Sequence, residues 1–405
     1  MATAVIGVVI FAITQLLISA RRLSLLGMDR PAAALLGAVA CVAAGVLAPR
    51  PAVEAIDGGT LVLLFGVMGM GAFLSVDGCF DQLEARMVRA SGSPQRLLGL
   101  TVWGSGVLSA FVTNDAVCLL ATPMMVRLIQ RHRLPPLPFL LAVATAANTG
   151  SVATLVGNPQ NMLCGQLGEL SYAQHLLWLG PVAVMGLGLC HGWLALVFRH
   201  PLAAARLEPV EAAAPMPWKV WATLGVIAGT AVAYSAGLDL PWTAAGGFVV
   251  LMLLHRQDTT ALWPRIDWAL LVFFASLFVV VGGFVATGAP AWLFEQLPLT
   301  GAGGWWRMAA VFLVGSNVVS NVPFILVVQG QLAAVSNPAL AWELLAMAST
   351  FAGNLTLIGS VANLIVAEAG RPMGGIGFWD YLKVGAPLAV ATSALGTAWL
   401  MCVVG

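Results

Sequence analysis

Long apolar stretches separated by short polar connections run the length of this 405-residue chain. Ten of them are long enough to cross a lipid bilayer as helices. Two further apolar regions, residues 97–129 and 306–328, are interrupted near the middle by polar residues around Asn114 and Asn321. We expect each of these two regions to form two half-length helices. The ten predicted spans are residues 4–20, 32–47, 60–76, 137–167, 175–198, 220–236, 242–254, 268–287, 342–367 and 381–404.

The basic residues indicate whether the two interrupted regions cross the membrane. If both turn back and the amino terminus lies outside, only Arg50 and Arg307 of the 18 basic residues fall outside, as the positive-inside rule requires. A full crossing by either region would destroy this segregation. We therefore predict re-entrant hairpins at about 97–130 and 305–330, with both termini outside. The predicted cytoplasmic basic residues are Arg21, Arg22, Arg30, Arg86, Arg89, Arg96, Arg127, Arg131, Arg133, Arg199, Arg206, Lys219, Arg256, Arg265, Arg371 and Lys383.

A weak internal repeat relates the two halves of the chain, and the order of its matched segments is kept. Each half has five spans and one hairpin, and an odd number of crossings inverts the second half. The predicted fold class is an all-α polytopic membrane protein with two inverted repeats, each containing a broken helix. The matched segments are Asp57 with Asp267, 109–114 with 316–321, and 154–161 with 356–363, at offsets of 210, 207 and 202.

The domain boundaries follow from the repeat and from a Pro- and Ala-rich connection. We predict a first repeat over residues 1–199, with its broken helix at about 137–168. A cytoplasmic linker covers residues 200–217. The second repeat covers residues 218–405, with its broken helix at about 342–368.

Composition supports a membrane location and excludes several other classes of protein. With 60% hydrophobic and 9% charged residues, the chain needs a lipid bilayer as its partner. A near balance of 18 basic and 17 acidic residues gives no reason to expect nucleic acid. The six cysteines are scattered singly, without CxxC pairs or clusters with histidine, so we predict neither a disulfide framework nor a zinc site. Zincin, GxSxG and Walker motifs are absent from the sequence, so we expect no enzyme activity and no cofactor.

Breaks in helices at membrane depth point to a binding site. Unpaired backbone groups are tolerated there only where they line a cavity or a protein-enclosed site. Half-helix amino termini suit anions and hydroxyl groups, and unwound carbonyls suit Na⁺. A single asparagine could simply join two helices, but polar residues at repeat-matched breaks favour a site. The predicted substrate- and ion-binding residues are Thr113, Asn114, Asp115, Asn148, Thr154, Asn158, Asn161, Ser320, Asn321, Asn354, Thr356 and Asn363.

Asp115 breaks the symmetry of the repeat, because its partner at the second hairpin is Val322. A carboxylate at membrane depth is costly unless it is paired or protonated. Asp115 is therefore our candidate carrier of the coupling proton or cation. The alternative is a structural cap on the second half-helix of the hairpin.

Three motifs carry a family resemblance that extends over essentially the whole chain. The segments 113–123, 148–161 and 353–363 resemble the ion transporter superfamily. The resemblance is greatest to its arsenite permease and silicic acid efflux branch, whose relatives include the melanosomal P protein and sodium/proton antiporters. Divalent-anion/sodium symporters are more distant relatives.

The resemblance implies separate scaffold and transport units and an elevator-type movement. It also implies that the hairpin residues Asn114 and Asn321, with the broken-helix residues Asn158 and Asn363, form the substrate and cation sites. A Na⁺ near Asn114, Asn158 and Asn321 is one such arrangement. The Ser-Asn-Thr motif of the symporters is only partly matched, which favours protons over Na⁺.

The breaks contain no Arg, Lys or His, so their uncharged lining favours a small neutral hydroxylated substrate. We therefore expect a secondary transporter of the cell inner (cytoplasmic) membrane that exports silicic or arsenous acid by H⁺ or Na⁺ antiport. A symporter of inorganic or dicarboxylate anions and a cation/proton antiporter remain alternatives. A channel is less favoured, because paired broken helices suit alternating access. A homodimer is one oligomeric state left open.

Overall fold

A computed structural model describes residues 2–19, 28–208, 215–256, 258–296, 298–299 and 304–404. α-Helices account for the regular structure of these ranges, with four short 3-10 turns between them. The fold class predicted from the sequence is therefore confirmed as all-helical. Two predicted cytoplasmic residues, Arg21 and Arg22, lie outside the described residues, as do residues 209–214 of the predicted linker.

The helices of the two halves follow the predicted segments closely, and the hairpins and broken spans each appear as two helices. The first half contains α1 (Ala2–Ser19), α2 (Arg30–Ala43), α3 (Pro49–Glu54), α4 (Gly58–Val76), α5 (Cys79–Ser91), α6 (Pro94–Phe111), α7 (Asn114–His132), α8 (Pro136–Ser151), α9 (Pro159–Leu167), α10 (Tyr172–Val197) and α11 (Arg199–Ala204). The second half contains α12 (Trp218–Ser235), α13 (Leu240–His255), α14 (Trp268–Ala286), α15 (Ala289–Gln296), α16 (Gly304–Val319), α17 (Asn321–Leu332), α18 (Pro338–Ala352), α19 (Val361–Ala369) and α20 (Phe378–Val403).

Among the described residues, four helices are both long and apolar enough to cross a membrane unaided: α4, α10, α14 and α20. Shorter apolar helices include α1, α2, α13 and α17. The short helices at the hairpins and breaks follow from local chemistry. Pro159 opens α9 directly after the capping residue Asn158, whose side chain accepts from the Asn161 backbone N–H at 2.8 Å. Ser360 caps α19 in the same manner.

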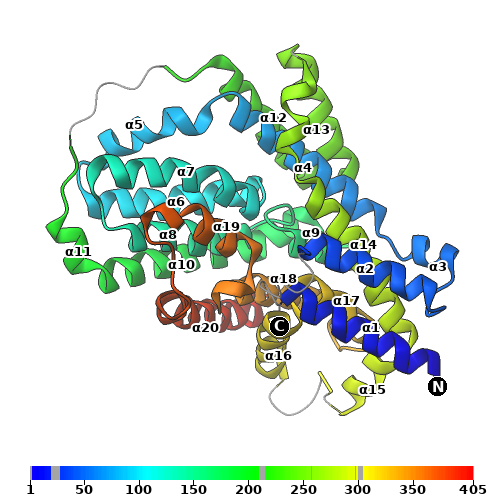
Figure 1. The fold of residues 1–405 in the computed structure, drawn as a ribbon. Coiled ribbons are helices and arrows are strands. Elements are labelled where there is room, and N and C mark those ends of the chain that lie inside the picture. The colour runs from blue at the N-terminus through cyan, green and yellow to red at the C-terminus, as the bar shows by residue number, and fades with distance from the viewer. Residues whose placement is uncertain are drawn as a thin grey trace.

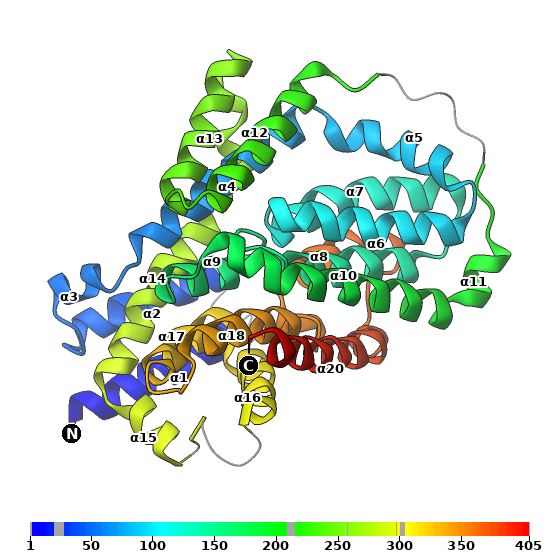
Figure 2. The same cartoon turned by 180° about the vertical axis from the view of Figure 1, so that it is seen from behind.

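Two groups of helices lie side by side in Figures 1 and 2. The span group consists of α1, α2, α4, α12, α13 and α14, in which α4 packs on α13 and α2 on α14. The hairpin group consists of α6 to α10 and α16 to α20, in which α6 packs on α8, α16 on α18, and α10 on α20. The groups meet mainly where α4 touches α9 and where α14 touches α17, with smaller contacts of α12 with α10 and α6 and of α4 with α7.

Equivalent acids begin one long helix in each half. Asp57 caps α4 by accepting from the Thr60 backbone N–H at 2.6 Å, and Asp267 caps α14 by accepting from Leu270 at 2.9 Å. These two residues are the pair that opens the predicted repeat. A cap of this kind stabilises a helix by about 1 kcal/mol.

Small residues allow the first hairpin to approach its broken helix. A Cβ built on Gly150 of α8 would overlap the backbone of Gly106 on α6. Close contact of this type between two helix backbones is possible only with glycine or similarly small residues. The contact between Gly106 and Gly150 therefore sets how closely α6 of the hairpin lies against α8.

Candidate substrate and ion site

Four helices begin at one cavity of about 60 Å³. The first residues of α7, α9, α17 and α19 all line it: Asn114, Pro159, Asn321 and Val361. Both hairpin tips and both helix breaks therefore meet at a single point. The amino terminus of a helix carries a partial positive charge and unpaired N–H groups, so this cavity favours hydrogen-bond acceptors and negative charge.

The two tip asparagines present amide oxygens without a protein partner. Asn114 donates through Nδ2 to Asn148 Oδ1 at 2.8 Å, and Asn321 donates through Nδ2 to the Gly359 carbonyl at 3.4 Å. Both residues are buried. Within the described part of the chain, no donor reaches the Oδ1 of either one. Buried acceptors are rarely left unsatisfied, so these two oxygens are the best candidates to receive a ligand hydroxyl or a cation.

The hydrogen-bond network fixes which atom of Asn114 faces the cavity. Asn354 donates to the Thr145 carbonyl at 3.2 Å, so its Oδ1 is the atom that accepts from Asn148 Nδ2 at 3.0 Å. The oxygen of Asn148 is then the atom that accepts from Asn114. A carbonyl can only accept, so the oxygen of Asn114 is left over.

Two further asparagines hold the breaks open in matching ways. Asn161 donates to the carbonyls of Ser151 and Thr154 at 3.2 and 2.9 Å. Asn363 donates to the carbonyls of Gly353 and Thr356 at 2.7 and 3.2 Å. All three positions are offset by 202 residues, which is the offset of the predicted repeat. The side-chain amides of Asn161 and Asn363 thus donate hydrogen bonds to backbone carbonyls at the breaks, where regular helical bonding is interrupted.

The remaining predicted polar residues also bind protein atoms. Asn158 donates to the hydroxyls of Ser151 and Thr350 at 2.8 and 3.1 Å. Thr154 donates to the Ala110 carbonyl, and Thr356 donates to Asn317 Oδ1 at 3.2 Å. These contacts tie the breaks to α18 and to the hairpins.

Asp115 lies between the central cavity and a larger one of about 410 Å³, and it lines both. Arg265 and Asp267, both in the connection between α13 and α14, also line the larger cavity. Arg30, the first residue of α2, lines the central cavity, and its charge acts on Asp115 together with that of Asp267. The charged residues of the site therefore come from both groups of helices.

Of the twelve predicted site residues, four line the central cavity: Asn114, Asp115, Ser320 and Asn321. Thr113 lines the larger cavity. The other seven lie behind the cavity walls and hold the breaks in place. Ser320 has a φ of 78°, a conformation that costs a non-glycine residue energy and clusters at functional sites.

Arg30, Gln160 and Ser360 also line the central cavity and were not predicted from the sequence. Arg30 lies outside the breaks, as the first residue of α2, so no charge at the breaks signals it. A second omission is the buried pair of His175 and Glu343. Glu343 carried a usable signal, because an acid inside an apolar span is costly and commonly functional.

Comparison with known proteins decides the family. The sequence profile described as "Citrate transporter" matches residues 8–352. The chain belongs to the citrate transporter family. Relatives of this citrate transporter family member include the silicon efflux transporter LSI3 of Oryza sativa subsp. japonica, which is 31% identical over 97% of this chain and 96% of LSI3. The putative transporter arsB of Dictyostelium discoideum is 23% identical over 92% of this chain and 87% of that protein.

A solved structure supports the fold of this citrate transporter family member. The crystal structure of the Alcanivorax borkumensis YdaH transporter matches with a TM-score of 0.54, covering 87% of each chain at 15% identity. The predicted resemblance to the ion transporter superfamily, including its arsenite and silicon branch, is confirmed. The chain is a multi-pass secondary transporter of this family.

Proposed function

We propose that this transporter exports a small metalloid hydroxy acid, such as silicic or arsenous acid, in exchange for protons. The observation that carries the proposal is the size and lining of the central cavity. A water molecule needs about 10–15 Å³ on the same measure. A cavity of about 60 Å³ therefore holds a solute of about four to six non-hydrogen atoms, which suits these acids and is too small for citrate.

The hydrogen-bonding character of the cavity fits a hydroxylated solute. Each O–H group of such an acid both donates and accepts. The free amide oxygens of Asn114 and Asn321 offer acceptors, and the four helix starts offer N–H donors. A carboxylate or sulfate oxygen cannot donate to the two amide oxygens and would leave them unsatisfied unless a cation were bound as well.

Proton coupling is assigned to Asp115. Its position between the two cavities gives one side chain contact with both the substrate space and a route toward the predicted cytoplasmic connection before α14. A carboxyl group there releases its proton most readily when Arg30 stabilises the resulting charge. Binding of substrate and of proton would then compete at one place, which is the requirement for antiport.

An elevator-type movement is proposed for the transport cycle. The hairpin group contains both tips and both breaks, while the span group contributes Arg30, Phe273 and Phe274 to one side of the cavity. Sliding of the hairpin group against the span group would carry the tips and breaks with it. The inverted repeats predicted from the sequence supply two related end states for this movement.

A second candidate is proton-coupled transport of a small carboxylate or inorganic anion. It is favoured by Arg30 at the cavity and by the description of the family as citrate transporters. Protonation of Asp115 would remove one negative charge from the cavity and so favour the binding of an anion. The small volume of the cavity argues against citrate in this arrangement.

Purified protein in proteoliposomes can separate the two candidates. Vesicles loaded with silicic or arsenous acid should release it faster when the outside is made acidic, and a Na⁺ gradient should have no such effect. Vesicles without protein and vesicles containing Asp115→Asn serve as controls. Transport of citrate or sulfate alone, with no metalloid efflux under any gradient, would contradict the proposal and favour the second candidate.

A further inference from the structure

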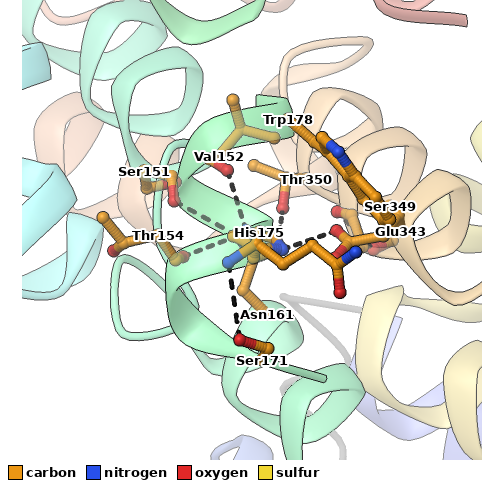
Figure 3. Close-up of polar contacts among 12 residues, drawn as sticks. Ser151, Val152, Thr154, Asn161, Ser171, His175, Trp178, Glu343, Ser349 and Thr350 are labelled. Carbon is orange, nitrogen blue, oxygen red and sulfur yellow. Dashed lines mark hydrogen bonds and ion pairs between the residues drawn. The ribbon is translucent and has the colours of Figure 1, made fainter. Parts of the chain in front are cut away.

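A histidine and a glutamate form a buried pair outside both cavities described above. His175 Nδ1 lies 2.6 Å from Glu343 Oε2, and the two side chains are 0% and 1% exposed. His175 is in the first turn of α10 and Glu343 is in the second turn of α18, so the pair joins the two halves of the chain (Figure 3). Ionisable groups at this depth are costly unless they are paired, and they commonly mark proton pathways.

The contacts of the imidazole determine how many protons the pair holds. His175 Nε2 lies 3.1 Å from the Val152 carbonyl, and a carbonyl only accepts, so Nε2 carries a hydrogen. The 2.6 Å contact between Nδ1 and Glu343 then requires one more proton, on either atom. Without it, the Nδ1 lone pair would face a carboxylate and the contact would become repulsive. The observed geometry therefore contains one proton shared between the two side chains.

The surroundings contain few groups that could compete for this proton. In the described ranges, neither residue makes another ion pair. The Cys164 thiol on α9 is near enough to interact electrostatically with Glu343. Tyr172, on the same helix as His175, packs against Tyr234 of α12 with ring centroids 5.1 Å apart. Helices α8 and α17, which also pack against α18, contain no titratable side chain.

Further ionisable side chains lie on the packed helices: Arg307 on α16, His191 on α10, and Asp380, Lys383 and Cys402 on α20. In the described part of the chain, none of them bonds to the pair. On α20 the Tyr381 hydroxyl donates to Asn354 at 3.4 Å, beyond the carboxyl end of α18. On α10 itself the Cys190 thiol contacts the Thr145 hydroxyl at 3.2 Å. Neither Tyr381 nor Cys190 is bonded to the pair.

The pair is attached directly to the first helix break. Val152, which accepts from His175, is the C-cap residue of α8, where the helix unwinds. Two turns after Glu343 on the same helix, Thr350 donates to Asn161 Oδ1 at 2.9 Å and accepts from Asn158. The break is therefore held to α18 by the Thr350 contacts at one point and by the His175–Glu343 contact at another.

We propose that His175 and Glu343 form a second proton-binding site, separate from Asp115, whose occupancy clamps the first helix break to α18. Uptake of one proton from water forms the Nδ1–H···Oε2 bond, and its release to water opens that bond. A role in transport rests on the proposed function, whereas proton binding itself does not.

The test uses the variant Glu343→Gln in the full-length protein purified in detergent, with unfolding midpoints measured across a range of pH. The glutamine amide can donate to the neutral Nδ1 without an added proton and so reproduces the contact of the protonated acid. The contact of the wild type requires a proton, so its midpoint should fall as pH rises. Glu343→Gln should lose that fall while keeping the midpoint that the wild type has at low pH. The same pH dependence in both proteins would overturn the proposal.

A second buried histidine–carboxylate pair, in the span group, provides a matched control. His255 Nε2 lies 2.9 Å from Asp77 Oδ2, again buried, on α13 and at the end of α4. Asp77→Asn should leave intact the part of the pH dependence that Glu343→Gln removes. If Glu343→Gln does not fold, the double variant His175→Leu with Glu343→Leu leaves no unpaired charge, and retention of the wild-type pH dependence by that protein would also refute the proposal. These measurements need no substrate, so their failure is distinguishable from failure of metalloid transport.

Discussion

The hairpin-tip asparagines differ from the other asparagines of the site in their free oxygen atoms. Asn148, Asn161 and Asn363 use both ends of their amides in bonds to protein atoms. Asn114 and Asn321 use only the nitrogen end. The first three residues therefore act by positioning the breaks, and the two tip residues are the ones expected to touch a ligand.

Alanine at either tip position should weaken substrate binding without unfolding the protein. Asn114→Ala and Asn321→Ala each remove one ligand acceptor, which is worth about 0.5–1.5 kcal/mol. The KM for efflux should rise about threefold to tenfold. Asn337→Ala is the control, because Asn337 caps α18 at its far end from the break. An unchanged KM in both tip variants would remove these oxygens from the site.

Replacement of Asp115 by asparagine separates coupling from binding. Asn has the same shape but cannot release a proton. Asp115→Asn should therefore abolish efflux driven by a pH gradient while substrate exchange between two compartments at equal pH continues. The predicted alternative, a cap by Asp115, is wrong, because Thr113 caps α7 by accepting from the Ala116 backbone N–H at 3.4 Å. If Asp115 has only a structural role in the first turn, both activities will persist in Asp115→Asn.

At the scale of elements, the breaks and hairpins could be predicted because their causes are local. Proline, glycine and asparagine near 150–161 and 353–363 interrupt the helices where the structure does. Charge placement predicts that the two hairpins turn back within the membrane, and this topology stays a prediction. Arg30 and the His175–Glu343 pair could not be found in this way, because each joins segments that are more than eighty residues apart in the sequence. A periodic pattern contains no information about such contacts.

The approach of α6 to α8 predicts a sharp difference in stability between substitution of a glycine on α8 and substitution of one on α6. Gly150→Ala places a methyl group against the Gly106 backbone, so the variant should lose about 1–3 kcal/mol or more of stability. Gly104→Ala on α6 meets nothing within 4 Å and should be neutral. Unfolding midpoints in detergent and the yield of monodisperse protein measure both. Equal stability of the two variants would contradict the packing described for the hairpin.

At the scale of the whole molecule, the arrangement into two groups determines what movement is available. The contact between α4 and α9 is one of the places where the groups meet. A Cβ on Gly59 of α4 would lie 2.9 Å from the Gln166 side chain of α9. Movement of the hairpin group must therefore separate these two residues.

A cross-link at that contact should stop transport. In a Cys402→Ser background, Gly59→Cys with Gln166→Cys is expected to lose efflux when a bifunctional thiol reagent is added, because the groups can no longer slide. The control lies within the span group, where a Cβ on Gly283 would lie 3.0 Å from the sulfur of Cys41. Gly283→Cys joined to native Cys41 should remain active. Full activity of the first cross-linked protein would exclude an elevator movement at this contact.

The four helix starts around the central cavity have a consequence for measurements of pH dependence. Peptide N–H groups do not titrate, so this part of the attraction between protein and solute is the same in acid and in alkali. Any change of substrate affinity with pH must then come from the solute itself or from the few ionisable side chains nearby. A binding titration repeated at several pH values would consequently count the proton sites of the carrier rather than report on its whole binding surface.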